Sequence, residues 1–145
     1  MEALVIDTSV IIKWYAVPQE PGHPIAKGLL SGHVAGRRRL HIPMLALYEA
    51  GNVLRQLQTR VTGGERPFEH VANLFSLELS THPLTLSRAM LAFELAHLFD
   101  LSFYDACFVA LAQELNMPLI TADERLCRQA AALPFIRPLT SARAT

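Results

Sequence analysis

Four acidic residues occupy positions where an alternating strand and helix pattern would bring them together. Asp7 directly follows the apolar run 3–6, and Asp123 follows a second short apolar run, 118–121. Glu49 falls in the first half of a predicted helix, and Asp105 precedes another. In a parallel sheet the carboxyl ends of the strands meet at one edge, and the helices that follow point their N-termini there. We therefore expect Asp7, Glu49, Asp105 and Asp123 to converge at one site.

Such a convergence of carboxylates indicates a metal site. Like charges within a few ångströms raise each other's pKa and oppose folding unless a cation lies between them. Oxygen ligands, without Cys or His at ligand spacing, favour Mg²⁺ or Mn²⁺ over zinc. Two such ions about 4 Å apart can activate water and stabilise both oxygens of an in-line phosphodiester displacement. The chemistry predicted here is hydrolysis of a nucleic acid.

The elements that must position these residues follow from apolar runs, helical spacing and turn residues. A short apolar run need not alternate with polar residues if the strand is covered on both faces, which is typical of parallel sheets. The predicted strands are 3–6, 40–42, 82–84 and 118–121. The predicted helices are 10–16, 22–31, 44–59, 67–79, 87–98 and 106–115, with a last helix that opens within 121–124. Gly63 and Gly64 are expected to break the chain between two of these helices.

Each acid also has a purely structural interpretation. Ser102 and Asp105 have the spacing of a capping box, so Asp105 could serve only the helix N-terminus. Glu49 could lie at the edge of an apolar stripe and reach water. In the last helix the capping box would pair Thr121 with Glu124, which would leave Asp123 free to point elsewhere.

The composition bounds the class of protein. The chain has 145 residues, 51% of them hydrophobic and 18% charged, which predicts one domain over residues 1–145. No segment approaches the roughly 20 apolar residues that span a bilayer, so we expect no membrane association and a cytoplasmic location. The 13 basic and 13 acidic residues cancel. If four acids gather in one site, 13 basic residues against nine acids leave +4 elsewhere, so a polyanionic substrate is not excluded.

Other polar residues have simpler expected roles. Gly32 to Gly36 is predicted to be a loop, followed by a solvated run of three arginines, 37–39, with phosphate contact as the alternative. Pro43 is expected in the first turn of a helix. The segment 13–15, Lys-Trp-Tyr, is expected to pack under the following loop, with contact to the bases of a nucleic acid or to a helix of a protein partner as the alternative. The cysteines and histidines are expected to be structural.

In order along the chain, Val5-Ile-Asp-Thr-Ser9, Ile42-Pro43 leading to Tyr48-Glu49, Phe103-Tyr-Asp-Ala106 and Leu119-Ile-Thr-Ala-Asp123 resemble the PIN-domain family. The resemblance covers essentially the whole chain. It implies an α/β fold, a PIN-like three-layer sandwich with a central parallel sheet flanked by helices. The length resembles that of stand-alone VapC-type toxins of toxin–antitoxin pairs. The resemblance thus implies a metal-dependent endoribonuclease that hydrolyses RNA, forms a homodimer and is inhibited by a cognate antitoxin.

The same resemblance implies residue roles. Asp7 and Asp105 would bind Mg²⁺ or Mn²⁺ most directly, while Glu49 and Asp123 would bind through water, complete a second site or orient the nucleophile. The nearby hydroxyls are expected either to hydrogen-bond these carboxylates or to cap helices, and they belong to Thr8 or Ser9 and to Thr121. Two alternatives remain open at this point, a non-catalytic protein-binding module with the same fold and a housekeeping RNA-processing nuclease.

Overall fold

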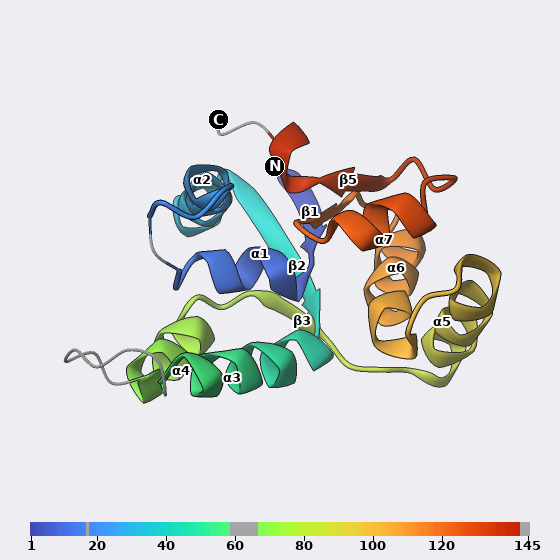
Figure 1. Ribbon diagram of the computed structural model, residues 1–145, viewed down its shortest axis with the longest axis horizontal. Coiled ribbons are helices and arrows are strands. Elements are labelled where there is room, and N and C mark those ends of the chain that lie inside the picture. Colours follow the sequence, from blue (N-terminus) through green and yellow to red (C-terminus); the bar gives the residue numbers. More distant parts are fainter. Residues whose placement is uncertain (17, 59–66, 143–145) are drawn as a thin grey trace.

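The protein is built on a five-stranded sheet in which every described strand pairing is parallel (Figure 1). The structure, a computed structural model, describes residues 1–16, 18–58 and 67–142. The strands are β1 (Glu2–Ile6), β2 (Arg38–Pro43), β3 (Ser80–His82), β4 (Leu119–Thr121) and β5 (Ile136–Pro138). Their order in the sheet is β3-β2-β1-β4-β5. The predicted parallel α/β class is confirmed.

Helices cover both faces of this sheet. They are α1 (Thr8–Lys13), α2 (His23–Val34), α3 (Leu45–Gln58), α4 (Pro67–Ser76), α5 (Leu86–Phe99), α6 (Phe103–Leu115) and α7 (Glu124–Gln129), followed by the short 3₁₀ helix η1 (Leu139–Ser141). Figure 1 shows α1 to α4 on one side of the sheet and α5 and α6 on the other, with α7 beside β4 and β5. This is the predicted three-layer sandwich.

Burial explains why the strand runs are apolar throughout. Leu4, Val5 and Ile6 of β1 are all buried, because helices cover the sheet on both faces. Helix α6 packs between the sheet and α5, and its residues from Ala106 to Ala112 are all buried. A helix that is apolar all round is typical of such a central position. Asp105 lies in the first turn of this helix.

The acids are expected at the edge of the sheet formed by the carboxyl ends of its strands, at the point where the strand order reverses. The chain moves from β1 to β2 and β3 on one side, and returns to β4 on the other side of β1. Strands β1 and β4 are therefore neighbours, with Ile6 opposite Ile120. Because ligands of open parallel sheets bind beyond the carboxyl ends at such a reversal, residues 7 and 121–123 occupy the expected place.

Three local predictions in the region before α3 were wrong. Helix α2 continues to Val34, so Gly32 is helical and not in a loop. Arg38 is not solvated but 3% exposed, and its guanidinium lies 3.4 Å from the Glu2 carboxylate on the neighbouring strand. Pro43 ends β2 and does not begin a helix. The predicted break at Gly63 and Gly64 lies outside the described residues.

The Lys-Trp-Tyr segment packs against the part of the chain that follows it, as expected. The Trp14 indole is buried and donates to the backbone oxygen of Ala26 at 2.9 Å. Lys13 pairs with Glu20 at 3.0 Å. Within the described ranges, no single helix is long and apolar enough to cross a membrane; α5 and α6 would pass that test only as a pair, bent by 115°.

Candidate active site

Asp7 is the most buried of the four acids, with 7% of its surface exposed. Its Oδ2 atom accepts two hydrogen bonds, from the hydroxyl of Ser9 at 2.6 Å and from that of Thr121 at 2.9 Å. Both donors take the same oxygen, so Oδ1 is left for a ligand. Burial raises the pKa of Asp7, the two hydroxyls oppose this rise, and the charges of Asp105 and Asp123 add to it.

These hydroxyls also tie β1 to β4. Ser9 accepts a hydrogen bond from the backbone N–H of Ala122 at 2.9 Å, and Thr121 accepts one from that of Asp123 at 3.0 Å. Asp7 itself takes the N-cap position of α1, which has no side-chain cap bond. The alternative in which Thr8 or Ser9 caps this helix is therefore wrong, because both lie within its first turn and face the carboxylates.

Glu49 faces the same edge from the second turn of α3. Its Oε1 atom accepts a hydrogen bond from the Thr8 hydroxyl at 2.8 Å, which joins the start of α1 to α3. Burial raises the pKa of Glu49, the Thr8 bond counteracts it, and the charges of Asp7 and Asp105 raise it further. The residue is half-buried against its neighbours, so the interpretation as a side chain that only reaches for water is insufficient.

Asp105 approaches from the opposite layer, in the first turn of α6. Ser102 is the N-cap of this helix, and its hydroxyl accepts the backbone N–H of Asp105 at 3.0 Å. The predicted cap is thus confirmed for Ser102. Burial raises the pKa of the Asp105 carboxyl, the Ser102 hydroxyl and Arg125 lower it, and the Asp123 charge raises it.

Contrary to the prediction from the sequence, Asp123 is not left free by the cap of the last helix. It is the N-cap of α7, and its Oδ1 atom accepts the backbone N–H groups of Arg125 and Leu126 at 2.9 and 3.2 Å. The predicted cap at Thr121 was wrong, because the Thr121 hydroxyl is engaged with Asp7. Asp123 still contributes its charge to the cluster, since it raises the pKa of both Asp7 and Asp105.

The carboxylate oxygens of these acids suit a hard cation that retains several bound water molecules. Carboxylate oxygens that repel one another are the ligands expected for Mg²⁺ or Mn²⁺. In the parts of the chain that the structure describes, no three His, Cys, Asp or Glu side chains are arranged to hold one ion. Mg²⁺ is commonly bound by one or two carboxylates with several waters and substrate phosphates, so the cluster fits it without a closed protein cage.

Two hollows flank the acidic edge. One, of about 270 Å³, is lined on the side of Glu49 and Asp105 by their sequence neighbours Tyr48 and Tyr104. The other, of about 630 Å³, includes Asp123 in its wall, together with Lys13 and Arg128 among others. Tyr48 and Tyr104 thus line one hollow, and Asp123 lines the other.

Sequence reasoning missed residues around the acids. Arg125 is an exposed cation whose charge acts on Asp105, and it stands two positions after Asp123. Arg125 could have been found from the sequence, because it lies in the first turn of a helix that follows a predicted site acid. Tyr48 and Tyr104 each precede a site acid directly, and the sequence motifs assign neither of them a role.

The cysteines and histidines remain outside the acidic cluster. Cys107 is buried and Cys127 half-buried, both are free, and burial raises the pKa of each thiol. His41 stacks on His82 at a ring distance of 5.2 Å, which joins β2 to β3. These positions match the expected structural roles, except that His97 is exposed on α5.

Comparisons with known proteins give the family and the fold. The family model described as the PIN domain matches residues 4–132. No curated protein matches the chain. A toxin–antitoxin complex from Klebsiella pneumoniae is similar with a TM-score of 0.70 and 17% identity, over 94% of this chain and 97% of that one.

Two further solved structures show the same fold. The Mycobacterium tuberculosis VapC20, described as a toxin that cleaves the sarcin–ricin loop, has a TM-score of 0.66 and 20% identity, over 93% of this chain and 99% of its own. The VapBC2 of Rickettsia felis, bound to a DNA fragment from its promoter, has a TM-score of 0.62 and 13% identity, over 94% and 96%. At these identities the likeness establishes the fold.

Proposed function

Because the chain belongs to the PIN domain family, we propose that it is a Mg²⁺- or Mn²⁺-dependent endoribonuclease and the cytoplasmic toxin of a type II toxin–antitoxin pair. One observation carries the nuclease proposal. Asp7, Glu49 and Asp105 come from three different helix–strand units, and burial together with their neighbours' charges raises the pKa of each carboxyl. Structural stability alone does not favour such repulsion, whereas a cation and a phosphodiester would relieve it.

The hydrogen bonds of each acid indicate the role that it would have in the reaction. Ser9 and Thr121 hold Oδ2 of Asp7, so Asp7 would bind a divalent ion through Oδ1, and Asp105 would bind it from the opposite layer. Thr8 holds Oε1 of Glu49, so Oε2 can orient or deprotonate the attacking water. A bound divalent ion would supply Lewis acidity and a more acidic water. Asp123 adds charge while it caps α7, which suits contact through water.

The biological setting is supported by the similar proteins and by the surface. The Klebsiella and Rickettsia structures are a toxin–antitoxin complex and a VapBC protein bound to promoter DNA. Here Leu86, Met90 and Phe93 of α5 are exposed at helical spacing and form an apolar stripe. Exposed apolar stripes mark protein contacts. We therefore include a cognate antitoxin and a homodimer in the proposal.

Cleavage of a long structured RNA tests the nuclease proposal. We expect wild type to cut with Mg²⁺ or Mn²⁺ and not with chelator, and Asp105→Asn to lose about 100-fold or more in rate, because a charged ligand becomes neutral. Glu94→Gln on α5 is the matched control, since it removes an exposed carboxylate away from the cluster. Cutting that survives both chelator and Asp105→Asn would contradict the assignment.

A further inference from the structure

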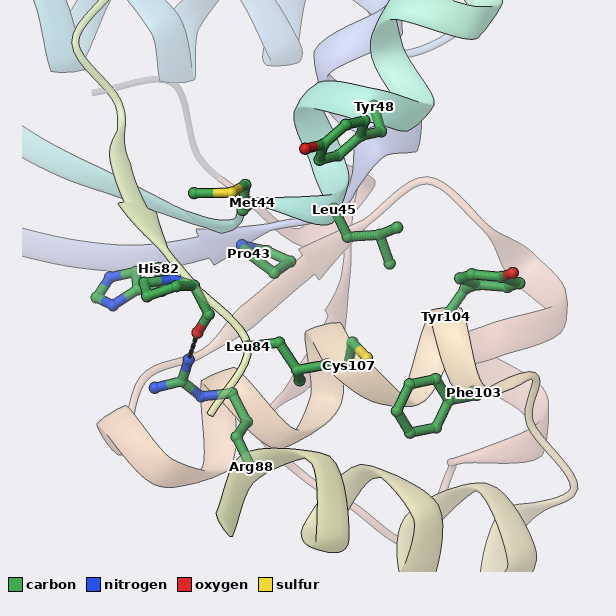
Figure 2. Close-up of a pocket in the computed structure, with 11 residues that line it drawn as sticks. Pro43, Met44, Leu45, Tyr48, His82, Leu84, Arg88, Phe103, Tyr104 and Cys107 are labelled. Carbon is green, nitrogen blue, oxygen red and sulfur yellow. Dashed lines mark hydrogen bonds between the residues drawn. The ribbon is translucent and has the colours of Figure 1, made fainter. Parts of the chain in front are cut away.

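The hollow lined by the sequence neighbours of Glu49 and Asp105 has mainly apolar and aromatic side chains in its walls. Figure 2 shows Tyr48 on α3 and Phe103 and Tyr104 at the start of α6 along one side of the hollow, with Leu45 between the two tyrosines and Leu84 on the other side. Tyr48 is 72% exposed and Tyr104 61% exposed. Large aromatic side chains held in the open give up burial, so their exposure calls for a ligand.

The charged residue in this wall is already engaged. Arg88 is buried and binds both carboxylate oxygens of Glu114, each at 3.0 Å, and also donates to the backbone oxygen of Pro83 (Figure 2). Its guanidinium is therefore committed to holding α5 against α6. The hollow presents apolar and aromatic faces to a ligand, which suits a flat ring and not a phosphate.

The position of the hollow relative to the acids indicates which kind of flat ring it binds. Tyr48 and Tyr104 are the residues immediately before Glu49 and Asp105. In a nucleic acid every phosphodiester is joined through one sugar to a base, so a strand whose phosphate reaches the acids must place a neighbouring base within about one nucleotide of them. Proteins that bind single strands supply aromatic side chains on which such bases stack.

We propose that this hollow is a base-stacking subsite, in which Tyr48 and Tyr104 hold an unpaired nucleobase of the substrate strand next to the phosphate that is cut. The inference rests on the nuclease function proposed above and specifies where an unpaired base of the RNA would bind. Since the hollow offers ring faces and few free polar groups, it recognises the presence of a base more than its identity. Both tyrosines are positioning residues, and the acids remain the catalytic ones.

Binding to two probes tests the subsite without knowledge of the target sequence. One probe is a labelled single-stranded RNA decamer, and the other is the same ribose–phosphate chain without bases. Fluorescence anisotropy is measured with an Asp7→Asn parent, which is expected to bind without cutting. We expect the parent to prefer the RNA about tenfold, and Tyr48→Ala or Tyr104→Ala to lose most of that preference, because stacking is removed while the backbone contacts stay.

Matched variants separate stacking from general effects. Tyr48→Phe and Tyr104→Phe keep the ring and are expected to keep the preference. Phe93→Ala removes an equally exposed aromatic that does not line the hollow and should behave as the parent. Since both tyrosines are exposed, their alanine variants should fold, which circular dichroism checks. A parent that does not distinguish the probes, or alanine variants that keep the full preference, would overturn the subsite and favour a protein side chain as its occupant.

Failure of the subsite and failure of the nuclease proposal give different results. If wild type cuts RNA with metal but the alanine variants match it in kcat/KM and in probe preference, only the subsite is wrong. If wild type cuts no RNA while the parent prefers the decamer and the alanine variants lose that preference, the base site stands and the nuclease function is wrong.

Discussion

At the scale of single residues, hydroxyl groups organise the acidic edge. Ser9 and Thr121 bind one oxygen of Asp7, and Thr8 binds one oxygen of Glu49. A hydrogen bond to a carboxylate favours its charged form. The hydroxyls therefore orient two crowded acids and favour their charged forms, against the burial that raises the pKa of each.

Thr121→Val tests this role with almost unchanged volume. The variant removes a donor to Asp7 and the acceptor for the Asp123 backbone N–H, so we expect about 1–3 kcal/mol less stability. Cleavage should fall about 10–100-fold, as for other groups that orient metal ligands. Because the lost bond favoured the ionised form, the pKa of Asp7 rises and the acid limb of the pH–rate profile moves to higher pH. Thr121→Ser keeps the hydroxyl, so its pH–rate profile should have the same acid limb as wild type. If the acid limb of the valine variant does not move, the Thr121 hydroxyl does not have this role.

Asp105→Asn is expected to separate activity from stability. Ser102, not the Asp105 carboxylate, accepts the backbone N–H at the start of α6, so the cap survives the substitution. Repulsion from Asp123 is removed at the same time. In chelator the variant should unfold at the same temperature as wild type or higher, by differential scanning calorimetry. A markedly lower midpoint would mean that Asp105 serves chiefly the helix.

At the scale of elements, a glycine sets how closely α2 approaches β2. A Cβ on Gly32 would lie 2.5 Å from Nε of Arg38, whose side chain is 2% exposed and paired with Glu2. The arginine cannot swing away without leaving its partner and its buried place. This contact explains why a residue of low helix propensity lies in the last turn of α2.

Gly32→Ala should therefore destabilise the protein by about 1–3 kcal/mol through overpacking, although alanine is intrinsically the better helix former. Gly51→Ala in α3 is the matched control, because its added Cβ would meet nothing within 4 Å. That variant should gain up to about 1 kcal/mol. Urea denaturation measures both, and equal effects of the two substitutions would refute the packing argument.

At the scale of the whole molecule, the acidic edge makes stability depend on pH and metal. The pKa values of Asp7, Glu49 and Asp105 are raised on folding from ordinary values of 3.8 for Asp and 4.5 for Glu. The folded state then binds more protons than the unfolded one, so these acids reduce stability as pH rises through that window. The pKa values of His41 and His82 are lowered from 6.5, mainly by burial, and act oppositely, reducing stability below that pH.

A bound metal ion should offset the loss of stability that the crowded carboxylates cause. This effect is measured best at a pH where the histidines are neutral in the folded and in the unfolded state. At pH 8, a tenfold excess of Mn²⁺ over its Kd should stabilise wild type by about 1.4 kcal/mol. At pH 5 the shift should shrink, because the carboxylates take up protons that compete with the ion. Thermal unfolding with and without Mn²⁺ measures this. An equal shift in Asp105→Asn, or none in wild type at pH 8, would contradict a metal site at this edge.

Local patterns predicted the seven helices, four of the five described strands and the places of the acids, but not β5 or the 3₁₀ helix η1. The apolar run before Asp7, the run before Asp123 and the capping serine at position 102 predict structures that form from neighbouring residues, and the structure contains each of them. Two errors, at Gly32 and Pro43, concern where an element ends, which short-range signals specify poorly.

The contacts that shape the site depend on the folded chain. Thr8 binds Glu49 across 41 residues of sequence, and Thr121 binds Asp7 across 114. A hydroxyl can cap its own helix or bind a distant carboxylate, and only the packing of β1, β4 and α3 decides between them. The same holds for Asp123 as a cap and for Tyr48 and Tyr104 around one hollow. Side-chain partners over such separations have no local signature, so the tertiary structure alone assigns them.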